Sequence, residues 1–175
     1  MDGLKVIIEK LSQYNFLTNI LPGTILSVVL TYWVGYNLLE VDDWYLQGII
    51  FYFVGLVNNR FGSLVVEPLS KKCKIVKFAK YTDYLKAEKK DDMIRTLNTE
   101  NNVFRSCASL CMLAIIAQLL SLLEKNWNWL HNLPNEHKTI CILAAILVLF
   151  GFSYRKQTSY IKKRVDKVNE SDKQQ

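Results

Sequence analysis

The sequence predicts an all-α integral membrane protein with four transmembrane helices, with helical extensions into the cytoplasm. The first observation is that four stretches, 16–39, 44–59, 106–123 and 139–154, contain no charged residue. A helix needs about 20 residues to cross a hydrocarbon core of roughly 30 Å, so the first and third stretches can span on their own. The second gains a turn from 61–66. The fourth gains one from Arg155 and Lys156, whose long side chains can reach the headgroups.

The second observation is the uneven distribution of Lys and Arg between these stretches. Segments 1–15, 67–105 and 155–175 carry two, ten and seven of them, whereas 40–43 carries none and 124–138 carries two. Basic residues near span ends are retained in the cytoplasm. We therefore predict a multi-pass protein with both termini cytoplasmic. The net charge of +6 mainly reflects this topology, so we expect contacts with membrane lipids and no direct nucleic-acid binding.

The first 15 residues have the pattern of an amphipathic helix lying in the inner interface. Leu4, Ile7, Ile8 and Leu11 recur at helical spacing among charged residues. In the following span, Pro22 removes a backbone hydrogen bond and predicts a kink or a fresh helix start. Both a hinge and a fixed entry bend agree with this pattern.

The second span, within the segment 16–66 that holds the first two spans, carries the principal candidate site. Gly48, Gly55 and Gly62 share one stripe, which predicts a face where another helix approaches closely. Asn58, Asn59 and Arg60 interrupt the apolar run, and a charge at a bilayer centre costs about 2.5 to 3.5 kcal/mol. We therefore expect Arg60 to have a partner, with Glu67 seven residues on as a candidate. The alternative is that Arg60 extends to the inner headgroups.

The segment 67–102 is predicted to be a cytoplasmic helical insertion. It opens with basic residues interleaved with apolar ones, which suit a surface of anionic lipid: Lys71, Lys72, Lys74 and Lys77. Its second helical part runs without Pro or Gly into the segment 103–154, which holds the third and fourth spans. Asn101, Asn102 and Arg105 enter the bilayer there at a depth comparable to Asn58 to Arg60. The sequence therefore predicts a polar layer between the second and third spans.

The fourth span continues into a basic helical tail, 155–175, predicted to be cytoplasmic. An alternation of four and three residues marks one helix face from Leu147 and Gly151 through Thr158, with the docking candidates Tyr154, Ile161, Val165 and Val168. This face predicts a contact with a copy of the chain or with a soluble partner. A basic tail held to headgroups is the competing interpretation.

No pattern of catalytic or metal-binding residues is present in the sequence. There is no phosphate-binding G-x-x-x-x-G-K-[ST] loop, no H-E-x-x-H and no C-x-x-C. Cys107 and Cys111 lie four apart on one helix, and His131 and His137 lie six apart with Pro134 between them, so neither pair predicts a metal site. We expect no cofactor, no metal and no enzymatic activity.

The run from Asn59 to Pro68, followed by a Tyr- and Lys-rich helix and by Asn101, Asn102 and Arg105, resembles the small four-span membrane proteins of bacterial antiphage-defence operons, such as the membrane component of the Kiwa system. The resemblance covers about residues 16 to 155. It implies an oligomer in the bacterial inner membrane that responds to infection together with a cytoplasmic effector. The small membrane accessory proteins of RNA-targeting CRISPR systems are an alternative relative, which implies a pore.

The leading functional expectation is thus a homo-oligomeric sensor or scaffold of the inner membrane that recruits or controls a cytoplasmic effector. The alternative is a pore that depolarises the membrane, in which Asn59, Arg60 and Arg105 from several copies ring a lumen. A third expectation is a structural subunit that binds lipid.

Overall fold

The computed structural model describes residues 13–35, 38–39, 42–127 and 132–172, with side chains up to residue 167, and every regular element in these ranges is helical. Four helices are long and apolar enough to span a membrane: Gln13–Val34, Trp44–Lys72, Met93–Asn126 and Asn135–Lys167. We call them the first to fourth spans. The all-helical class and the number of helices of spanning length are confirmed. Most of the predicted interfacial helix at 1–15 lies outside the described residues.

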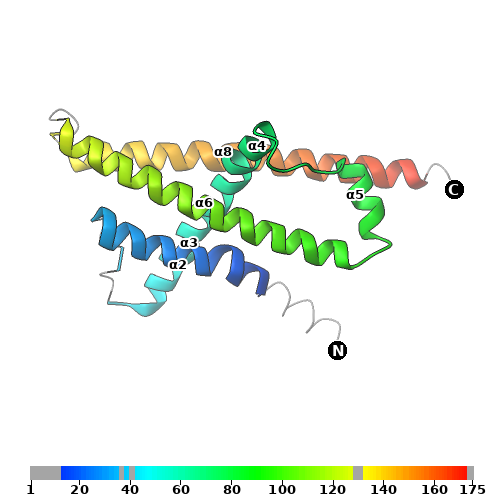
Figure 1. Ribbon diagram of the computed structural model, residues 1–175, viewed down its shortest axis with the longest axis horizontal. Helices are drawn as coiled ribbons and strands as arrows, with labels where there is room; N and C mark the ends of the chain where they lie inside the picture. Colours follow the sequence, from blue (N-terminus) through cyan, green and yellow to red (C-terminus); the bar gives the residue numbers. More distant parts are fainter. Residues whose placement is uncertain (1–12, 36–37, 40–41, 128–131, 173–175) are drawn as a thin grey trace.

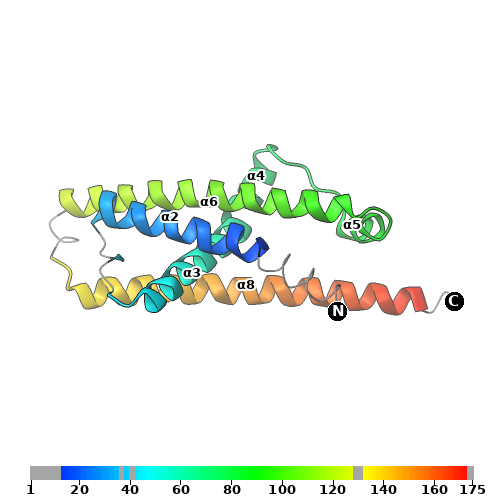
Figure 2. The ribbon, with the colours of Figure 1, turned by 90° about the horizontal axis from the view of Figure 1, so that it is seen from below.

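Two long helices set the length of the molecule. Helices α6 (Met93–Asn126) and α8 (Asn135–Asp172) have 34 and 38 residues, or about 51 and 57 Å at 1.5 Å per residue. Both exceed a hydrocarbon core of roughly 30 Å. Figures 1 and 2 show them running along the molecule, with helix α3 (Trp44–Phe61) crossing them obliquely. The short helix α5 (Tyr81–Glu88) and the last turns of α8 lie at one end, which we call the α5 end.

The first span is a continuous helix made of three parts: η1 (Phe16–Ile20, π-helical), α2 (Leu21–Val29) and η2 (Leu30–Val34, π-helical). The helix does not start afresh at Pro22, because the backbone of Ile20 and Leu21 is already helical; its geometry changes from π to α at Leu21, directly before the proline. The span ends at Val34, where Gly35 turns the backbone with a φ of 88°. The charge-free stretch continues to residue 39, so the helix is shorter than that stretch.

The second span begins at a side-chain cap and continues beyond the apolar stretch. The Asp43 carboxylate accepts hydrogen bonds from the backbone N–H groups of Tyr45 (2.9 Å) and Leu46 (3.4 Å). After α3 the chain forms η3 (Gly62–Val66, π-helical) and α4 (Glu67–Lys72), so the helix passes Pro68 without interruption. Turns with i→i+5 hydrogen bonds are rare in proteins, and those that occur are often found at functional sites.

The first and second spans cross at two glycines. A methyl group on Gly23 would clash with the Phe51 carbonyl oxygen, and one on Gly55 would clash with the Asn19 backbone. The two backbones therefore approach closely only because neither residue has a side chain.

At the α5 end, α5 lies between the two long helices. Leu85 is buried, and the Tyr81 and Tyr160 rings have centroids 5.3 Å apart. The Lys167 ammonium donates to the Thr82 carbonyl oxygen over 2.7 Å. These contacts join the first turn of α5 to the last part of α8.

Candidate functional site

Polar groups from all four spans meet near the middle of the molecule and form what we call the polar junction. It consists of the Thr18 carbonyl and the side chains of Asn19, Asn58, Asn59, Ser63, Glu67, Arg105, Ser106, Ser109 and Lys156. Its centre is buried within a single copy: Thr18, Asn58 and Ser109 are fully buried and Ser106 is 1% exposed. Buried polar groups require hydrogen-bond partners, so the partners fix how the helices pack.

Asn58 ties the second span to the third. Its amide nitrogen donates to the carbonyl and hydroxyl oxygens of Ser106 at 3.1 and 3.0 Å, and the Ser109 hydroxyl donates to the Asn58 carbonyl at 2.7 Å. The Ser106 hydroxyl in turn donates to the Thr18 carbonyl of the first span at 3.0 Å. Three helices are thus joined through one buried amide and two hydroxyls.

A second chain of contacts runs through Asn59. Its amide nitrogen donates to the Asn19 side-chain oxygen at 2.9 Å, and its own oxygen accepts from Arg105 at 3.3 Å. The Arg105 guanidinium also donates to Glu67 at 3.1 Å. Polar contacts therefore continue from the first span through the second to Arg105 of the third.

Glu67 sits among three cations. Its carboxylate, 10% exposed, contacts Arg105 at 3.1 Å, Lys71 at 2.7 Å and Lys156 at 3.4 Å. The Lys156 ammonium also donates to the Ser63 carbonyl and hydroxyl oxygens at 2.6 and 2.8 Å. Lys156 comes from α8, so this ammonium is the point at which the fourth span joins the junction.

Comparison with models of known protein families, with curated proteins and with solved structures found no match.

The expected pairing of Arg60 with Glu67 is wrong. Glu67 is paired with Arg105, Lys71 and Lys156, and no hydrogen bond or ion pair within the described ranges involves the half-buried Arg60 side chain. The cause is the π-helical segment Gly62–Val66 between the two residues. Residues seven apart share a face in a regular α-helix, but turns with i→i+5 hydrogen bonds advance fewer degrees per residue and place Glu67 on another face.

The expected polar layer between the second and third spans is narrower than the sequence indicated. Arg105 reaches Asn59 and Glu67, whereas Asn101 is exposed and Asn102 is half-buried. For the part of the chain that the structure describes, neither of these two amides has a hydrogen bond. The reason is the oblique crossing of α3 over α6, which limits contact to a few residues (Figure 1).

The glycine stripe serves two different neighbours. Gly55 packs on the first span, and a methyl group on Gly62 would stand 3.2 Å from the Ser109 side chain of α6. Gly48 is exposed and has no atom within 4 Å of its added methyl position. Within one copy, Gly55 and Gly62 of the stripe therefore pack on other helices, and Gly48 does not.

The other predicted surface residues lie at the periphery. Lys71 is paired with Glu67 and lies over the Phe78 ring, while the remaining basic residues Lys72, Lys74 and Lys77 are exposed. Tyr154, Ile161 and Val165 are exposed on α8, and the Val168 side chain lies outside the described residues.

Sequence reasoning missed more than half of the polar junction. It did not single out Thr18, Asn19, Ser63, Ser106 or Ser109 as site residues, and it assigned Lys156 to the headgroups. The available signal was that each is a polar residue inside an apolar stretch or at its end, and such residues in a span face other helices. Their register relative to Asn58 depends on helix crossings that the sequence does not specify.

The chemistry of the junction is hydrogen bonding and ion pairing between helices. In the described ranges there is no group of three or more His, Cys, Asp or Glu residues that could hold a metal. Two buried atoms, the Asn58 side-chain oxygen and the Arg105 Nε, have no partner in that same part of the chain. The junction therefore retains unused hydrogen-bonding capacity beside a carboxylate shared by three cations.

Proposed function

We propose that the protein is a homo-oligomeric membrane scaffold and sensor that holds a cytoplasmic effector, in the setting of bacterial antiphage defence. The observation that carries this proposal is a mainly apolar face of α8 that the chain itself leaves uncovered from Leu147 to Val165. We call it the α8 seam; it consists of Leu147, Gly151, Tyr154, Thr158, Ile161, Val165 and, by its spacing in the sequence alone, Val168.

The exposure of the seam supports a contact outside the single chain. Leu147 and Tyr154 are 74% and 77% exposed, and Ile161 and Val165 are 56% and 51% exposed. The seam extends over 21 residue steps, or about 32 Å of helix. Its membrane half would tolerate lipid, but Ile161 and Val165 lie beyond the apolar stretch, where exposed apolar residues mark interaction sites.

The part of the seam beyond the apolar stretch faces away from the second span. Lys156 points to Ser63 and Glu67, so this side of α8 faces the second span. Thr158, Ile161 and Val165 follow Lys156, Ser159 and Lys163 by two residues, or about 200° around the helix. A parallel pairing of two α8 helices can therefore form without disturbing the contacts within one copy.

The polar junction favours a sensor over the pore alternative. A lumen ringed by Asn59, Arg60 and Arg105 needs these side chains free, but Asn59 and Arg105 are hydrogen-bonded within one copy, and Arg60 alone of the three has no partner among the described residues. A carboxylate shared by three cations offers alternative pairings of similar geometry, which is the property required of a two-state element. The antiphage setting rests on the resemblance of the Asn59 to Pro68 run, which contributes Asn59, Ser63 and Glu67 to the junction.

Cysteine cross-linking in membranes tests the oligomer. All four native cysteines, Cys73, Cys107, Cys111 and Cys141, are free and exposed, so they are first replaced by serine. Thr158→Cys should then give an oxidised dimer. The adjacent Ser159→Cys, about 100° around the helix, should not. Equal yields at both positions, or none at Thr158→Cys, would contradict an α8 pairing.

Two further measurements separate the scaffold from the pore. A scaffold should leave growth and membrane potential unchanged when it is expressed alone. Loss of potential that is abolished by Arg60→Ala would support the pore instead. Ile161→Asp with Val165→Asp should release a co-purifying soluble partner, whereas Lys162→Asp with Asp166→Lys, on another face of the same helix, should retain it.

A further inference from the structure

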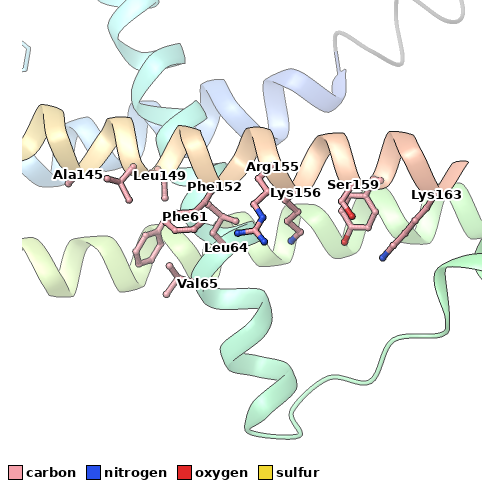
Figure 3. A pocket seen from close by; sticks show the side chains of 12 residues that line it. Phe61, Leu64, Val65, Ala145, Leu149, Phe152, Arg155, Lys156, Ser159 and Lys163 are labelled. Carbon is pink, nitrogen blue, oxygen red and sulfur yellow. The ribbon is translucent and has the colours of Figure 1, made fainter. Parts of the chain in front are cut away.

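We propose that the groove between the second span and α8 is a binding site for an anionic phospholipid of the inner leaflet. The groove lies on the side of α8 opposite the seam and has a volume of about 780 Å³. Figure 3 shows side chains of both helices directed into it, with Phe61, Leu64 and Val65 on one wall and α8 residues on the other. This site goes beyond the proposed function and does not depend on oligomer formation.

The groove changes character along α8 in the same order as a lipid leaflet. From Ala145 to Phe152 the α8 lining is apolar, and from Arg155 to Lys163 it is basic and hydroxylic. The apolar part covers about 11 Å of helix. Half of a hydrocarbon core is about 15 Å thick, so an acyl chain in this part places its headgroup beside the basic part.

The charge of the groove favours a phosphate. Among the described residues that line it, Arg155, Lys156 and Lys163 are basic and none is acidic. Lys156 is already bonded to Ser63 and Glu67, whereas neither Arg155 nor Lys163 has a hydrogen bond or ion pair among the described residues. These two cations are therefore available to an anion from outside the chain.

The spacing of the donors suits one headgroup. Arg155, Ser159 and Lys163 are four residues apart and form a row on one helix face, about 6 Å from one to the next along the axis. Figure 3 shows Arg155, Ser159 and Lys163 extending from the same side of α8. A guanidinium can bind two phosphate oxygens at once, and a lysine and a hydroxyl can complete the contact. Basic pockets between spans on the cytoplasmic side are typical sites for acidic lipid headgroups.

Thermal unfolding of the full-length protein in detergent with added lipid tests this site. Phosphatidylglycerol should stabilise the wild type more than phosphatidylcholine with the same acyl chains. Arg155→Ala with Lys163→Ala should weaken the apparent affinity for phosphatidylglycerol by about tenfold. Lys162→Ala with Arg164→Ala removes the same charge from exposed positions outside the groove and should leave that affinity unchanged.

Three further arms make the result decisive. Ala145→Trp fills the apolar part without changing charge and should weaken phosphatidylglycerol binding. Inorganic phosphate and glycerol phosphate should not stabilise the protein as the lipid does. Without added lipid, the circular dichroism spectrum and the unfolding temperature should be unchanged in the Arg155 and Lys163 variant, which shows that the variant is folded. Equal losses in both double variants, no loss in either, or equal protection by inorganic phosphate would overturn the lipid site.

Discussion

The first three spans and the fourth are held in the molecule by different kinds of contact. In the apolar middle part of the first span 33% of the residues are buried, whereas 0% are buried in the corresponding part of the fourth span. The first three spans share backbone approach at glycine and fully buried hydrogen bonds. At the polar junction, α8 is joined through the Lys156 ammonium.

In the proposed membrane setting, this difference separates the spans that hold the fold together from the span that can contact other molecules. Lipid tails are as apolar as leucine, so spans associate through small residues and polar contacts rather than through hydrophobic burial. The first three spans contain both features where they cross. The α8 span contains few of them and keeps its seam exposed, so it is the part of the fold available to other molecules.

The largest effect should come from Glu67→Gln, because this carboxylate belongs to both regions. Its loss leaves Arg105 and Lys156 without their anion, and removing one partner of a buried pair costs about 3 kcal/mol. We expect that decrease in the free energy of unfolding, measured by denaturant titration in detergent. Glu124→Gln, which breaks the more exposed pair with Lys138, is the control and should cost clearly less. Equal costs would mean that the junction is not tightly coupled.

Breaking only the first region requires Gly55→Ala. The new methyl group meets the Asn19 backbone, so the first and second spans must separate, and such overpacking costs about 2 kcal/mol. The same unfolding titration measures it. Gly48→Ala is the matched control, because its methyl group meets no atom within 4 Å and should leave stability unchanged or slightly higher. A neutral Gly55→Ala would show that the close crossing is absent.

A smaller effect is expected from Asn58→Ala. The change removes the donor to both Ser106 oxygens, and interhelical hydrogen bonds between spans are worth about 1 kcal/mol. Asn101→Ala removes an exposed amide from the neighbouring helix and should have no cost. If both variants lose the same free energy of unfolding, the buried Asn58 amide contributes no more to stability than the exposed Asn101 amide.

Lys156→Met should sharpen the comparison by loosening α8 alone. The ammonium is 27% exposed at its side chain, so we expect a loss below about 1 kcal/mol in global stability. The distribution of distances between spin labels at Ile49→Cys and Ile140→Cys should nevertheless broaden, because α8 is held less firmly. Both label sites are exposed, and they report on the second span and α8. Lys162→Met is the control. An unchanged distance distribution would mean that other contacts hold α8.

The smallest effect concerns Tyr84 on α5, at the end where the two regions meet. Burial and the adjacent Glu88 carboxylate, which accepts a hydrogen bond from the phenol at 3.2 Å, raise the pKa of Tyr84 above its ordinary value. The neutral phenol is favoured in the fold, so its contribution to stability is present below about pH 10 and is lost as pH rises through the raised pKa. Phenolate absorbance compared with Tyr84→Phe measures this titration. Glu88→Gln should move it to lower pH.

The fold was predictable because it depends on composition and length. Charge-free stretches indicated four spans, and the absence of Pro and Gly before Ser106 indicated that α6 would be continuous. Less than half of the site was predictable. Asn58, Asn59, Glu67 and Arg105 are conspicuous in apolar surroundings.

The remainder could not be read from the sequence for two physical reasons. The partners Thr18, Ser106 and Ser109 are ordinary residues in a span, and only the crossing geometry brings them to Asn58. The face on which Glu67 lies depends on a π-helical segment whose presence has no simple sequence signal, so a prediction based on regular helix spacing chose Arg60 as its partner.

Because of the π-helical segment Gly62–Val66, the second span should tolerate a one-residue deletion at some positions and not at others. A turn closed from i to i+5 contains one residue more than an α-helical turn, so a single deletion there can restore regular geometry while both flanking faces keep their directions. A single deletion between Gly48 and Gly55 would instead turn one flank by about 100° relative to the other. Asn58 and Asn59 would then lose alignment with the first span, and natural variants of this chain should accordingly differ in length at 62–66 rather than upstream.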